Sequence, residues 1–542
     1  MAHASINGQQ IHFTDTGGDG PVVILGHGFL MDHTMFRHQV EALRGQYRVI
    51  TWDERCFGDT TFDGQPFSYW DSARDCIALL DHLGIERAVV GGMSQGGFLS
   101  LRAALLAPER VRALILLDTQ AGGEAPEVTA AYQGMIDTWA TVGPVDELAA
   151  IIATIIIDDE AENGTWIQKW QSRPKELIVE AGRYAEPAIV IDVPRVTVEG
   201  RGWPEFSGSG EHAVVIVAAE GVTVRGIVAT NTGYSDLDDR AGILVRDTRD
   251  CLVEGNRLRD VTFGIYLRRS TGCVVRRNDV VAHVTLQSGG GNGVHLWYSP
   301  RNRIERNTVR GHRDGIYFEF SPGCIAADNE SAQNQRYGLH FMFSDSCRYV
   351  SNTFRDNVSG VAVMFSRGVV IHGNRFEHAW GGAAYGLLMK EILGGEVTEN
   401  VFDGNSTGLH LEGASHLMIR GNTFSHNGWG VRVLASAESD TFTANRFTAN
   451  AFDVATNSRT ASSTFDRNWW GDYQGYDLDR DGVGDVPFRP VRLFALVVEQ
   501  HGPALMLLRS PVVGILDAAE RMLPVLTPDV LVDAHPLMRS PR

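Results

Sequence analysis

The sequence predicts a mainly β protein: a right-handed parallel β-helix, preceded by a shorter segment in which strands alternate with helices. Two repeated phrases predict the β-helix. A Gly-led run of alternating apolar residues recurs along the chain, and an Asn-led phrase recurs between its copies, with most of the Asn residues 22 or 23 positions apart. A fixed period in this range is typical of solenoids. The leading residues are Gly264, Gly293, Gly315, Gly338, Gly360, Gly386, Gly408 and Gly430, and Asn256, Asn278, Asn307, Asn329, Asn352, Asn374, Asn400, Asn422, Asn445 and Asn468.

Each period contains two or three short runs in which apolar and polar residues alternate, separated by Gly, Asn, Asp and Ser. Alternation with a period of two indicates strands, and the helical rhythm of 3.6 residues is absent. Strands repeated at one spacing can stack with one coil per period. Asn side chains that recur once per coil can then bond amide to amide along the axis. We therefore expect the Asn column to hold the coils together and to take no part in chemistry.

The first 170 residues follow a different pattern, in which apolar strands alternate with helical stretches. This order is typical of an α/β segment built on a parallel sheet. The expected strands cover residues 22–25, 49–52, 88–91 and 113–117, and the expected helices cover about 72–83 and 96–106.

Residues 92–96 read Gly-Met-Ser-Gln-Gly and lie between an expected strand and an expected helix. In that setting Gly-x-Ser-x-Gly is a nucleophile elbow, because the glycines allow a sharp turn that exposes Ser94 at the start of the helix. The backbone N–H groups of Phe29 and Gln95 would form the oxyanion hole. Phe29 follows the sequence Leu-Gly-His-Gly at the end of the first strong strand.

These motifs make residues 5–170 resemble the α/β-hydrolase superfamily, of the esterase and lactonase type. The resemblance implies a serine hydrolase in which a His and an acid activate the nucleophile. The sequence departs from the family at Cys56, where Gly is usual. It also departs after the elbow, where we do not find the family's lid, last two strands, acid and late His.

The next His after the elbow helix is His212, which already lies in the repeats, and Asp118 at the end of a strand is an alternative acid. Ser without a general base is a weak nucleophile. We therefore expect residues 1–172 to be a truncated, inactive hydrolase segment. Ser94 and Asp118 are the catalytic residues that it would retain. The alternative is a working esterase that takes its His from the solenoid.

The Gly-led strands can be aligned into columns, because stacked strands lie about 4.8 Å apart and successive side chains alternate between faces. The first and third positions after Gly are apolar and are expected to face the interior; the second and fourth are expected to face outward. The second column contains Tyr266, His295, Tyr317, His340, Ala362, Leu388, His410 and Arg432. The fourth column contains Arg268, Trp297, Glu319, Met342, Met364, Lys390, Glu412 and Leu434.

One region of these columns predicts a copper site. His340 and Met342 share a face, Met364 lies one coil further along, Glu319 one coil back, and His295 one coil beyond that. Thioether and imidazole are ligands suited to Cu(I). The same Met and aromatic residues could instead form a patch that docks a protein partner, and the two roles are compatible.

Distinctive strings occur at residues 293–299, 311–320, 338–344, 384–391 and 452–457, and in the tail from 468. Through these strings, residues 178–542 resemble the NosD family of periplasmic maturation proteins of nitrous oxide reductase. The resemblance implies a β-helix protein that takes copper from a lipoprotein chaperone and works with the membrane subunit of an ABC transporter. Its role would be in assembling the copper centres of the reductase, and so in denitrification. The resemblance itself assigns no copper ligands.

A β-helix enzyme that acts on polysaccharides, a lyase or an epimerase, is a further alternative. Such a site needs a groove of acids, Arg and Lys for proton abstraction. The outward columns offer Met, Tyr and Trp at their centre, with Lys390 and Glu391 to one side, which disfavours this function. The net charge of −18 argues against nucleic acid or an anionic membrane surface as the main partner and fits cationic ligands.

The tail, residues 471–542, follows the expected β-helix of residues 178–470. Its acids Asp477, Asp479, Asp481 and Asp485 occupy positions 1, 3, 5 and 9 of a calcium-loop pattern with Gly482 at position 6. The Glu expected at position 12 is absent. The pattern predicts a calcium site, and the alternative is a solvated acidic turn.

The apolar runs 491–498, 504–508 and 512–526 predict amphipathic helices that cap the solenoid or dock on a membrane partner. No apolar run is long enough to span a bilayer. Residues 1–30 show no charged region followed by an apolar run, so no secretory signal is visible, although the family resemblance implies the periplasm. The six cysteines have no metal-like spacing and are expected to be buried thiols.

Overall fold

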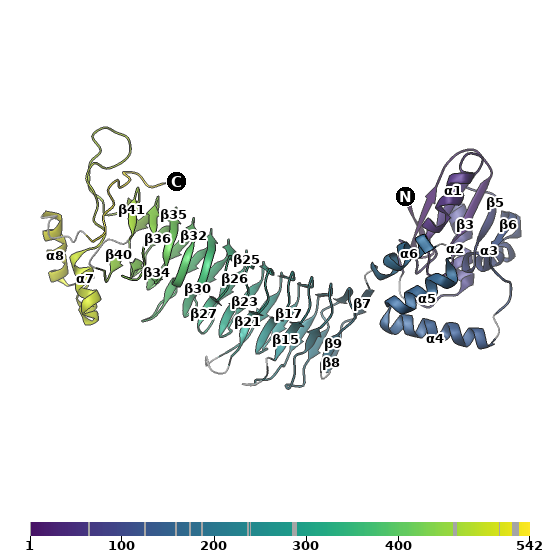
Figure 1. Cartoon of the computed structure of the whole chain (residues 1–542), viewed down its shortest axis with the longest axis horizontal. Helices are drawn as coiled ribbons and strands as arrows, with labels where there is room; N and C mark the ends of the chain where they lie inside the picture. The colour runs from purple at the N-terminus through teal and green to yellow at the C-terminus, as the bar shows by residue number, and fades with distance from the viewer. Residues whose placement is uncertain are drawn as a thin grey trace. The chain divides into compact units, whose positions relative to one another are not determined.

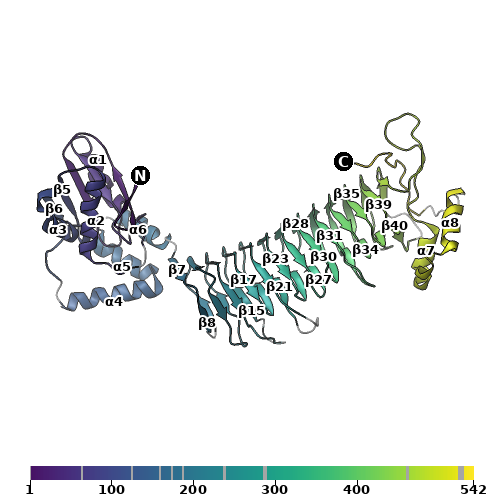
Figure 2. The ribbon, with the colours of Figure 1, turned by 180° about the vertical axis from the view of Figure 1, so that it is seen from behind.

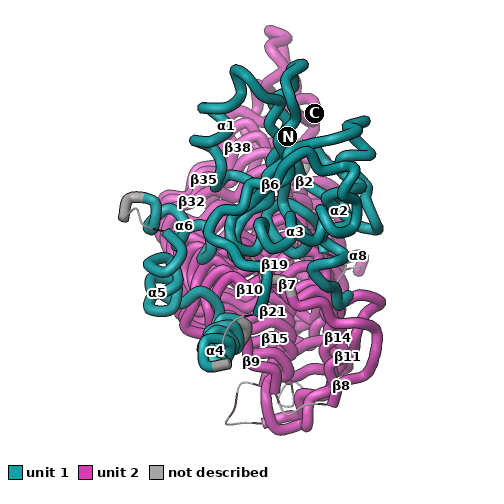
Figure 3. The backbone as a smooth tube through the Cα atoms, turned by 90° about the vertical axis from the view of Figure 1, so that its right-hand side faces the viewer, with its two compact units in different colours: residues 1–171 teal, residues 172–542 magenta. Residues whose placement is uncertain are grey.

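The chain folds into two compact units, Met1–Gln171 and Ser172–Arg542 (Figure 3). They are seen in a computed structural model. It describes residues 2–62, 65–123, 126–157, 160–172, 175–185, 188–235, 238, 240–284, 290–458, 463–508, 510–522 and 530–541.

The first unit is built on a six-stranded sheet of order β1-β2-β4-β3-β5-β6. The first two strands are antiparallel and the last four are parallel, as the alternation of strands and helices predicts. Strand β6 pairs only with β5, so it forms an edge of the sheet. The strands are β1 (Ala2–Ile6), β2 (Gln9–Asp15), β3 (Val22–Gly26), β4 (Arg48–Trp52), β5 (Ala88–Met93) and β6 (Val111–Leu117).

Helices connect these strands and then continue the first unit beyond β6. Helix α2 buries Leu79 and Leu80 in the same apolar cluster as Leu99 of α3 and Ile24 of β3, which fixes the base of the elbow. The helices are η1 (His33–Phe36), α1 (Arg37–Leu43), α2 (Tyr69–His82), α3 (Gln95–Leu106), η2 (Pro108–Arg110), α4 (Pro126–Val142), α5 (Asp146–Ile156) and α6 (Glu160–Ser172).

The second unit is a parallel β-helix with three strands in each coil, which confirms the predicted fold class (Figures 1 and 2). The Gly-led strands lie in the first row, and each pairs in parallel with its counterpart one coil away. This row is β9 (Ile189–Ile191), β12 (Val215–Val217), β15 (Ala241–Arg246), β18 (Phe263–Arg268), β21 (Asn292–Trp297), β24 (Asp314–Glu319), β27 (Tyr337–Met342), β30 (Ser359–His372), β32 (Tyr385–Thr398), β34 (Thr407–Glu412), β37 (Trp429–Val433) and β40 (Phe452–Thr456).

The other two rows are shorter, and the long strands β30 and β32 run through the corner between the first row and the second. The second row is β7 (Lys175–Val179), β10 (Val196–Gly200), β13 (Thr223–Arg225), β16 (Leu252–Glu254), β19 (Val274–Arg276), β22 (Arg303–Glu305), β25 (Ile325–Ala327), β28 (Arg348–Val350), β35 (Ser415–Arg420), β38 (Thr441–Thr443) and β41 (Thr464–Asp466). The third row is β8 (Arg183–Ala185), β11 (Glu205–Ser207), β14 (Val228–Thr230), β17 (Arg257–Arg259), β20 (Asp279–Val281), β23 (Thr308–Arg310), β26 (Glu330–Ala332), β29 (Thr353–Arg355), β31 (Arg375–Glu377), β33 (Val401–Asp403), β36 (Thr423–Ser425), β39 (Arg446–Thr448) and β42 (Trp469–Trp470).

The interior explains why Gly is the second residue of each first-row strand from β15 to β37. A Cβ atom on Gly338 would lie 3.0 Å from the ring of Phe354 and 2.9 Å from the carbonyl oxygen of Gly360. The space is taken because third-row aromatic rings stack from coil to coil through the core. The ring centroids of Phe402 and Phe424, for example, lie 4.7 Å apart with nearly parallel planes. Gly is therefore the residue that fits between the core and the next coil.

The predicted Asn ladder is confirmed. From Asn256 to Asn468, the side-chain amide of each recurring Asn donates to the Oδ1 atom of the next, over 2.9–3.0 Å. The ladder ends on Asp533, whose Oδ2 atom accepts from the side-chain amide of Asn468 at 3.1 Å and from the indole of Trp470 at 3.0 Å. Asp533 therefore takes the place of the next Asn at the end of the solenoid.

The tail forms helices, as expected: α7 (Leu493–Gln500), η4 (Gly502–Leu507) and α8 (Pro511–Met522). Helix α7 covers the last coil, because Phe494 and Val498 pack with Phe452 of β40 in one apolar cluster. The capping role is thus confirmed for α7. The end of the predicted apolar run, residues 523–526, and Arg509 lie outside the described residues.

Candidate functional site

The strand registers bring the predicted columns together. Tyr317 of β24 lies beside His340 of β27, and Glu319 lies beside Met342. Met342 in turn lies beside Met364 of β30. The alignment made from the sequence alone is therefore confirmed for this part of the solenoid.

The second column is buried, which corrects the expectation that it faces solvent. His295 is 9% exposed and His340 is 6% exposed. The cause is aromatic packing within the column and beside it. The ring of His295 lies 4.5 Å from that of Tyr266 and 4.8 Å from that of Tyr317, and the ring of His340 lies 4.9 Å from those of Tyr317 and Tyr337.

Each of these two imidazoles has one nitrogen engaged by a neighbour. The Nδ1 atom of His295 lies 3.1 Å from the side-chain amide nitrogen of Asn292, and the Nδ1 atom of His340 lies 3.4 Å from Nη2 of Arg336. The Nε2 atoms of both rings are buried and have no hydrogen-bond partner among the described residues. Burial, with a smaller contribution from Arg313, lowers the pKa of His295 to about 3, so this ring is neutral at physiological pH.

A buried ion pair beside His340 went unnoticed in the sequence. Asp314 accepts a hydrogen bond from Nε of Arg336 at 2.8 Å, and a second from its Nη2, and its Oδ2 atom lies 3.8 Å from Nδ1 of His340. Burial alone would raise the pKa of Asp314, but the hydrogen bond from Arg336 and the nearness of His340 outweigh it and lower the pKa to about 2. An Asp directly before the Gly of one coil, followed one period later by Arg, is the signal that could have revealed the pair.

The fourth column is half-buried, so Met342, Met364 and Glu319 can be reached from solvent. The thioether of Met342 lies 3.9 Å from the hydroxyl of Tyr317. Tyr317 separates His295 from His340, and these two residues with Glu319 do not form a tight ligand cluster in the described part of the chain. The strand registers place His340 two residues from Met342 on β27 and Met364 beside Met342 on β30, and they place His295 two coils back, on β21.

In the first unit, the four predicted hydrolase residues meet at one cavity. Phe29, Ser94, Gln95 and Asp118 all line a cavity of about 710 Å³. Ser94 has a φ of 49°, the strained conformation that a nucleophile elbow imposes. Gln95 is the first residue of α3, so its N–H group is among those with no acceptor inside the helix. The placement of these residues matches a hydrolase site.

No His is among the described residues that line the cavity, so the usual general base for a Ser nucleophile is not among them. The imidazole nearest in sequence to the oxyanion loop, His27, is buried, and its Nε2 atom accepts from the backbone N–H of Glu54 at 3.1 Å. The expectation that the lid is missing is wrong, since α4 and α5 line the cavity with Trp139, Ile152 and other apolar side chains. No further strand of this unit follows β6 in the described residues.

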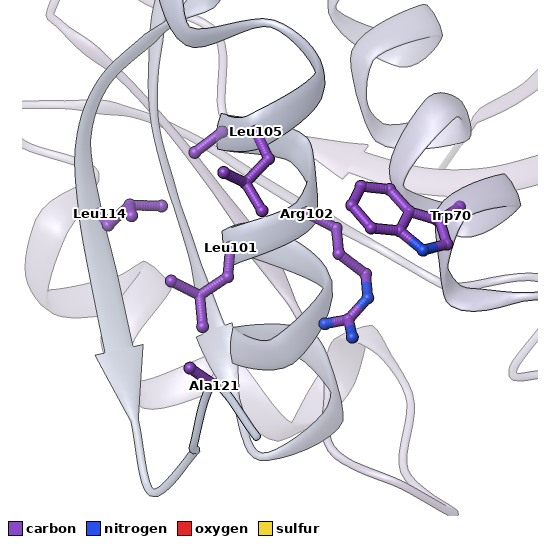
Figure 4. Close-up of a pocket in the computed structure, with 7 residues that line it drawn as sticks. Trp70, Leu101, Arg102, Leu105, Leu114 and Ala121 are labelled. Atoms are coloured by element: carbon purple, nitrogen blue, oxygen red, sulfur yellow. The ribbon is translucent and has the colours of Figure 1, made fainter. Parts of the chain in front are cut away.

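Strand β6 is the last strand of the first unit's sheet, and apolar side chains are exposed beside it. Leu114 of β6 lies beside Leu101 and Leu105 of α3 around a shallow apolar hollow, with Arg102 and Trp70 on its other side (Figure 4). In a longer sheet, further strands would cover this edge.

Two clusters contain ligand types that metals prefer. His12, His33 and Asp53 lie together in the first unit. Asp53 already accepts hydrogen bonds from both imidazoles and from the backbone N–H groups of His33 and Asp59, so it has a structural role.

The predicted calcium loop is the second cluster. Asp477, Asp479 and Asp481 come together, while Asp485 accepts from the backbone N–H of Leu478. Gly482 has a φ of 89°, as its turn position requires. The calcium site itself stays a prediction.

The described helices include none that is both long and apolar enough to cross a membrane. Five of the six cysteines are buried, as expected: Cys76, Cys251, Cys273, Cys324 and Cys347. The expectation is wrong for Cys56, which is exposed.

Comparison with known sequences finds two families. The model of the family described as "Periplasmic copper-binding protein (NosD)" matches residues 281–475. The model described as "alpha/beta hydrolase fold" matches residues 21–162.

Three relatives illustrate the similarity. The chain is 30% identical over 380 residues to the probable ABC transporter binding protein NosD of Pseudomonas aeruginosa. That alignment covers 67% of this chain and 87% of the relative. It is 37% identical over 125 residues to epoxide hydrolase 3 of Siraitia grosvenorii, which covers 22% of this chain and 39% of the relative. The solved A-module of mannuronan C-5 epimerase AlgE6 from Azotobacter vinelandii is 13% identical with a TM-score of 0.37, covering 57% of this chain and 89% of that one.

We predict that Asp314→Asn lowers the free energy of unfolding by about 2 kcal/mol at neutral pH. The pKa of Asp314 in the folded chain, about 2, lies below its ordinary value of 3.8. Ionised Asp314 therefore stabilises the fold fully at pH values above its ordinary pKa of 3.8. This contribution is lost as the pH falls through the folded-state pKa of about 2. Urea denaturation followed by circular dichroism at several pH values measures the difference.

The surface variant Asp328→Asn is the control, and we expect it to change stability by less than about 0.5 kcal/mol because its carboxylate is exposed. A loss of stability in Asp314→Asn that is the same at every pH would contradict the role of the ionised carboxylate.

We predict that the full chain hydrolyses p-nitrophenyl butyrate no faster than its Ser94→Ala variant, because the described cavity wall supplies no His to activate the hydroxyl. The release of p-nitrophenolate measures the rate. Covalent capture of a fluorophosphonate by Ser94, together with turnover that Ser94→Ala abolishes, would show instead that a base reaches the cavity.

Proposed function

Since the chain belongs to the NosD family, we propose that its solenoid unit handles copper and binds an ABC transporter in the maturation of nitrous oxide reductase. The family description as a periplasmic copper-binding protein and the relative named as an ABC transporter binding protein both support this role. The same description supports a periplasmic location for the activity. We also propose, from the family resemblance, that a lipoprotein copper chaperone and the reductase are its other partners.

The observation that carries the copper proposal is the grouping of His340 with Met342 and Met364. The Nε2 atom of His340 is buried and lacks a partner among the described residues, and the two thioethers lie one coil apart on a half-buried column. Imidazole and thioether together suit Cu(I) rather than a hard cation. We place the copper cargo at these three residues, with Glu319 and His295 as neighbours rather than ligands of the same ion.

The surroundings of these residues favour reversible binding. The group offers thioethers and an imidazole but no thiolate, the ligand that binds soft metals most tightly. The ion pair of Asp314 and Arg336 holds the side of His340 that bears Nδ1, so the imidazole is oriented before copper arrives. A half-buried column leaves the ion within reach of a second protein. A carrier that accepts copper and passes it on needs both properties.

The tail supports the proposed contact with the transporter. Met506, Ile515 and Met522 are all exposed, on η4 and α8, although α7 of the same segment is packed against the last coil. Exposed large apolar side chains gathered on one short segment mark interaction sites. We propose that this segment contacts the membrane subunit of the transporter, while α7 anchors it to the solenoid.

A serine-hydrolase activity of the first unit is the alternative function. The meeting of Ser94, Gln95, Phe29 and Asp118 at one cavity favours it. The absence of His from the described lining disfavours turnover, so we rank the copper role first.

We predict that the full chain binds Cu(I) and that the double variant Met342→Leu/Met364→Leu weakens this binding at least about tenfold, because Leu keeps the volume but cannot ligate. Competition with a colorimetric Cu(I) chelator under anaerobic conditions measures the affinity. His340→Gln is expected to have a similar effect.

The matched control is His410→Ala. His410 occupies the same buried column and has a lowered pKa of about 4, caused by burial and by Arg432, but its neighbours in the fourth column are Lys390 and Glu412 instead of methionines. It should leave copper binding unchanged. Equal affinity of the wild-type chain and the double Met variant would exclude the proposed site.

We predict that Met506→Glu, Ile515→Glu and Met522→Glu together reduce binding to the co-expressed ABC transporter more than tenfold, since each buried apolar side chain contributes about 1.5–3 kcal/mol. Affinity purification of the detergent-solubilised complex measures retention. Met418→Glu, at an exposed position of the solenoid, is the control. Full retention of the triple variant would place the transporter contact elsewhere.

A further inference from the structure

Four aromatic side chains form a continuous row on the surface of the solenoid. Tyr298, Phe320, Phe343 and Phe365 each follow the fourth-column residue of their coil. Their ring centroids are 4.6, 5.1 and 5.1 Å apart in succession, and their planes differ by at most 19°. We call these four residues the surface aromatic row. It runs along the ends of β21, β24 and β27 and along β30.

Three of the four rings are exposed and Phe320 is half-buried, and the backbone conformation of the row is unfavourable for large side chains. Tyr298, Phe343 and Phe365 are 48%, 43% and 39% exposed. The φ angles of the four residues lie between 47° and 53°. An L-residue in this left-handed region costs roughly 1–2 kcal/mol relative to its usual conformation, and a later coil has Gly413 at the same position. Neither burial nor backbone preference therefore accounts for aromatic residues here.

Charged residues continue this column at both ends. Arg269 precedes Tyr298 by one coil, and Glu391 follows Phe365 by one coil. Both are exposed. The column thus reads Arg, Tyr, Phe, Phe, Phe, Glu along the solenoid. Consider two copies of the chain related by a two-fold axis that passes between Phe320 and Phe343. Arg269 of each copy would then lie opposite Glu391 of the other, which gives two such pairs.

We propose that the surface aromatic row is the interface of an antiparallel homodimer. Two copies of one solenoid have the same repeat of about 4.8 Å, so their rows stay in register along the whole contact. A two-fold interface is self-complementary, as the order of charges in this column requires. An unrelated partner would have to match both the repeat and the charge order, which a second copy matches by construction.

The local charges are compatible with this arrangement. Arg269 is held by Asp247 of its own chain, with 2.7 Å between Nε and Oδ1, so the guanidinium is positioned before association. Asp247 would face Gly413 of the second copy, over which the Glu391 carboxylate of that copy lies, and Arg269 would lie between these two carboxylates. The inference does not depend on copper binding, because Met342 and Met364 belong to the neighbouring fourth column.

Sedimentation equilibrium of the full chain tests the proposal. The wild-type chain should dimerise at concentrations below about 100 μM. Phe343→Asp should make it monomeric. Arg269→Glu and Glu391→Arg should each raise the dissociation constant at least about tenfold, because each change creates two like-charge contacts in the dimer. The double variant Arg269→Glu/Glu391→Arg should restore association to within about threefold of wild type.

The exposed residue Trp380 supplies the control, since Trp380→Asp lies outside this column and should leave the dimer intact. Circular dichroism confirms that each variant is folded. A wild-type chain that stays monomeric throughout this range would overturn the proposal. So would a double variant that associates as weakly as the single ones, because the two charges would then not face each other.

Discussion

The ladder of Asn side chains is the constraint on which the solenoid depends. From Asn256 to Asn468 every amide bonds to the next, and the last one bonds to Asp533. A buried amide without partners would cost roughly 1–3 kcal/mol, so each coil is held at one height and one rotation relative to its neighbour. The side-chain columns of the solenoid, both in its core and on its surface, take their register from this ladder.

That register turns residues far apart in sequence into neighbours. His340, Met342 and Met364 are adjacent because β27 and β30 pair without a shift. The same pairing builds the buried stack of tyrosine and histidine rings, and burial in this stack lowers the pKa of His295 and keeps its imidazole neutral. The soft ligand set and the buried rings beside it thus arise from one stacking rule. The acidic net charge of the chain, −18, adds a general attraction for cations.

The repeat made much of the site predictable from the sequence. Spacing alone placed Met342 beside Met364 and Tyr317 beside His340, because a period maps directly onto a register. The burial of His340 was harder to predict. It depends on side chains that lie beside the column, such as Tyr337. The bend before the strand sets the position of Tyr337 relative to His340. The ion pair of Asp314 and Arg336 was missed for the same reason. It crosses from one coil to the next at that bend.

The first unit shows the complementary case. The elbow sequence predicted the position of Ser94, because a Gly-x-Ser-x-Gly turn is a local structure. The helices α4 and α5 that roof the cavity were not predicted, since their roles depend on contacts with distant residues such as Phe29. Local motifs thus identified the chemistry of the site, while its enclosure required the folded structure.

X-ray absorption at the copper K edge tests the central claim most directly, with the full chain carrying one equivalent of Cu(I). The account predicts sulfur ligands together with imidazole nitrogen in the wild-type chain, and no sulfur in Met342→Leu/Met364→Leu. A copper environment made only of nitrogen and oxygen in the wild-type chain would contradict it.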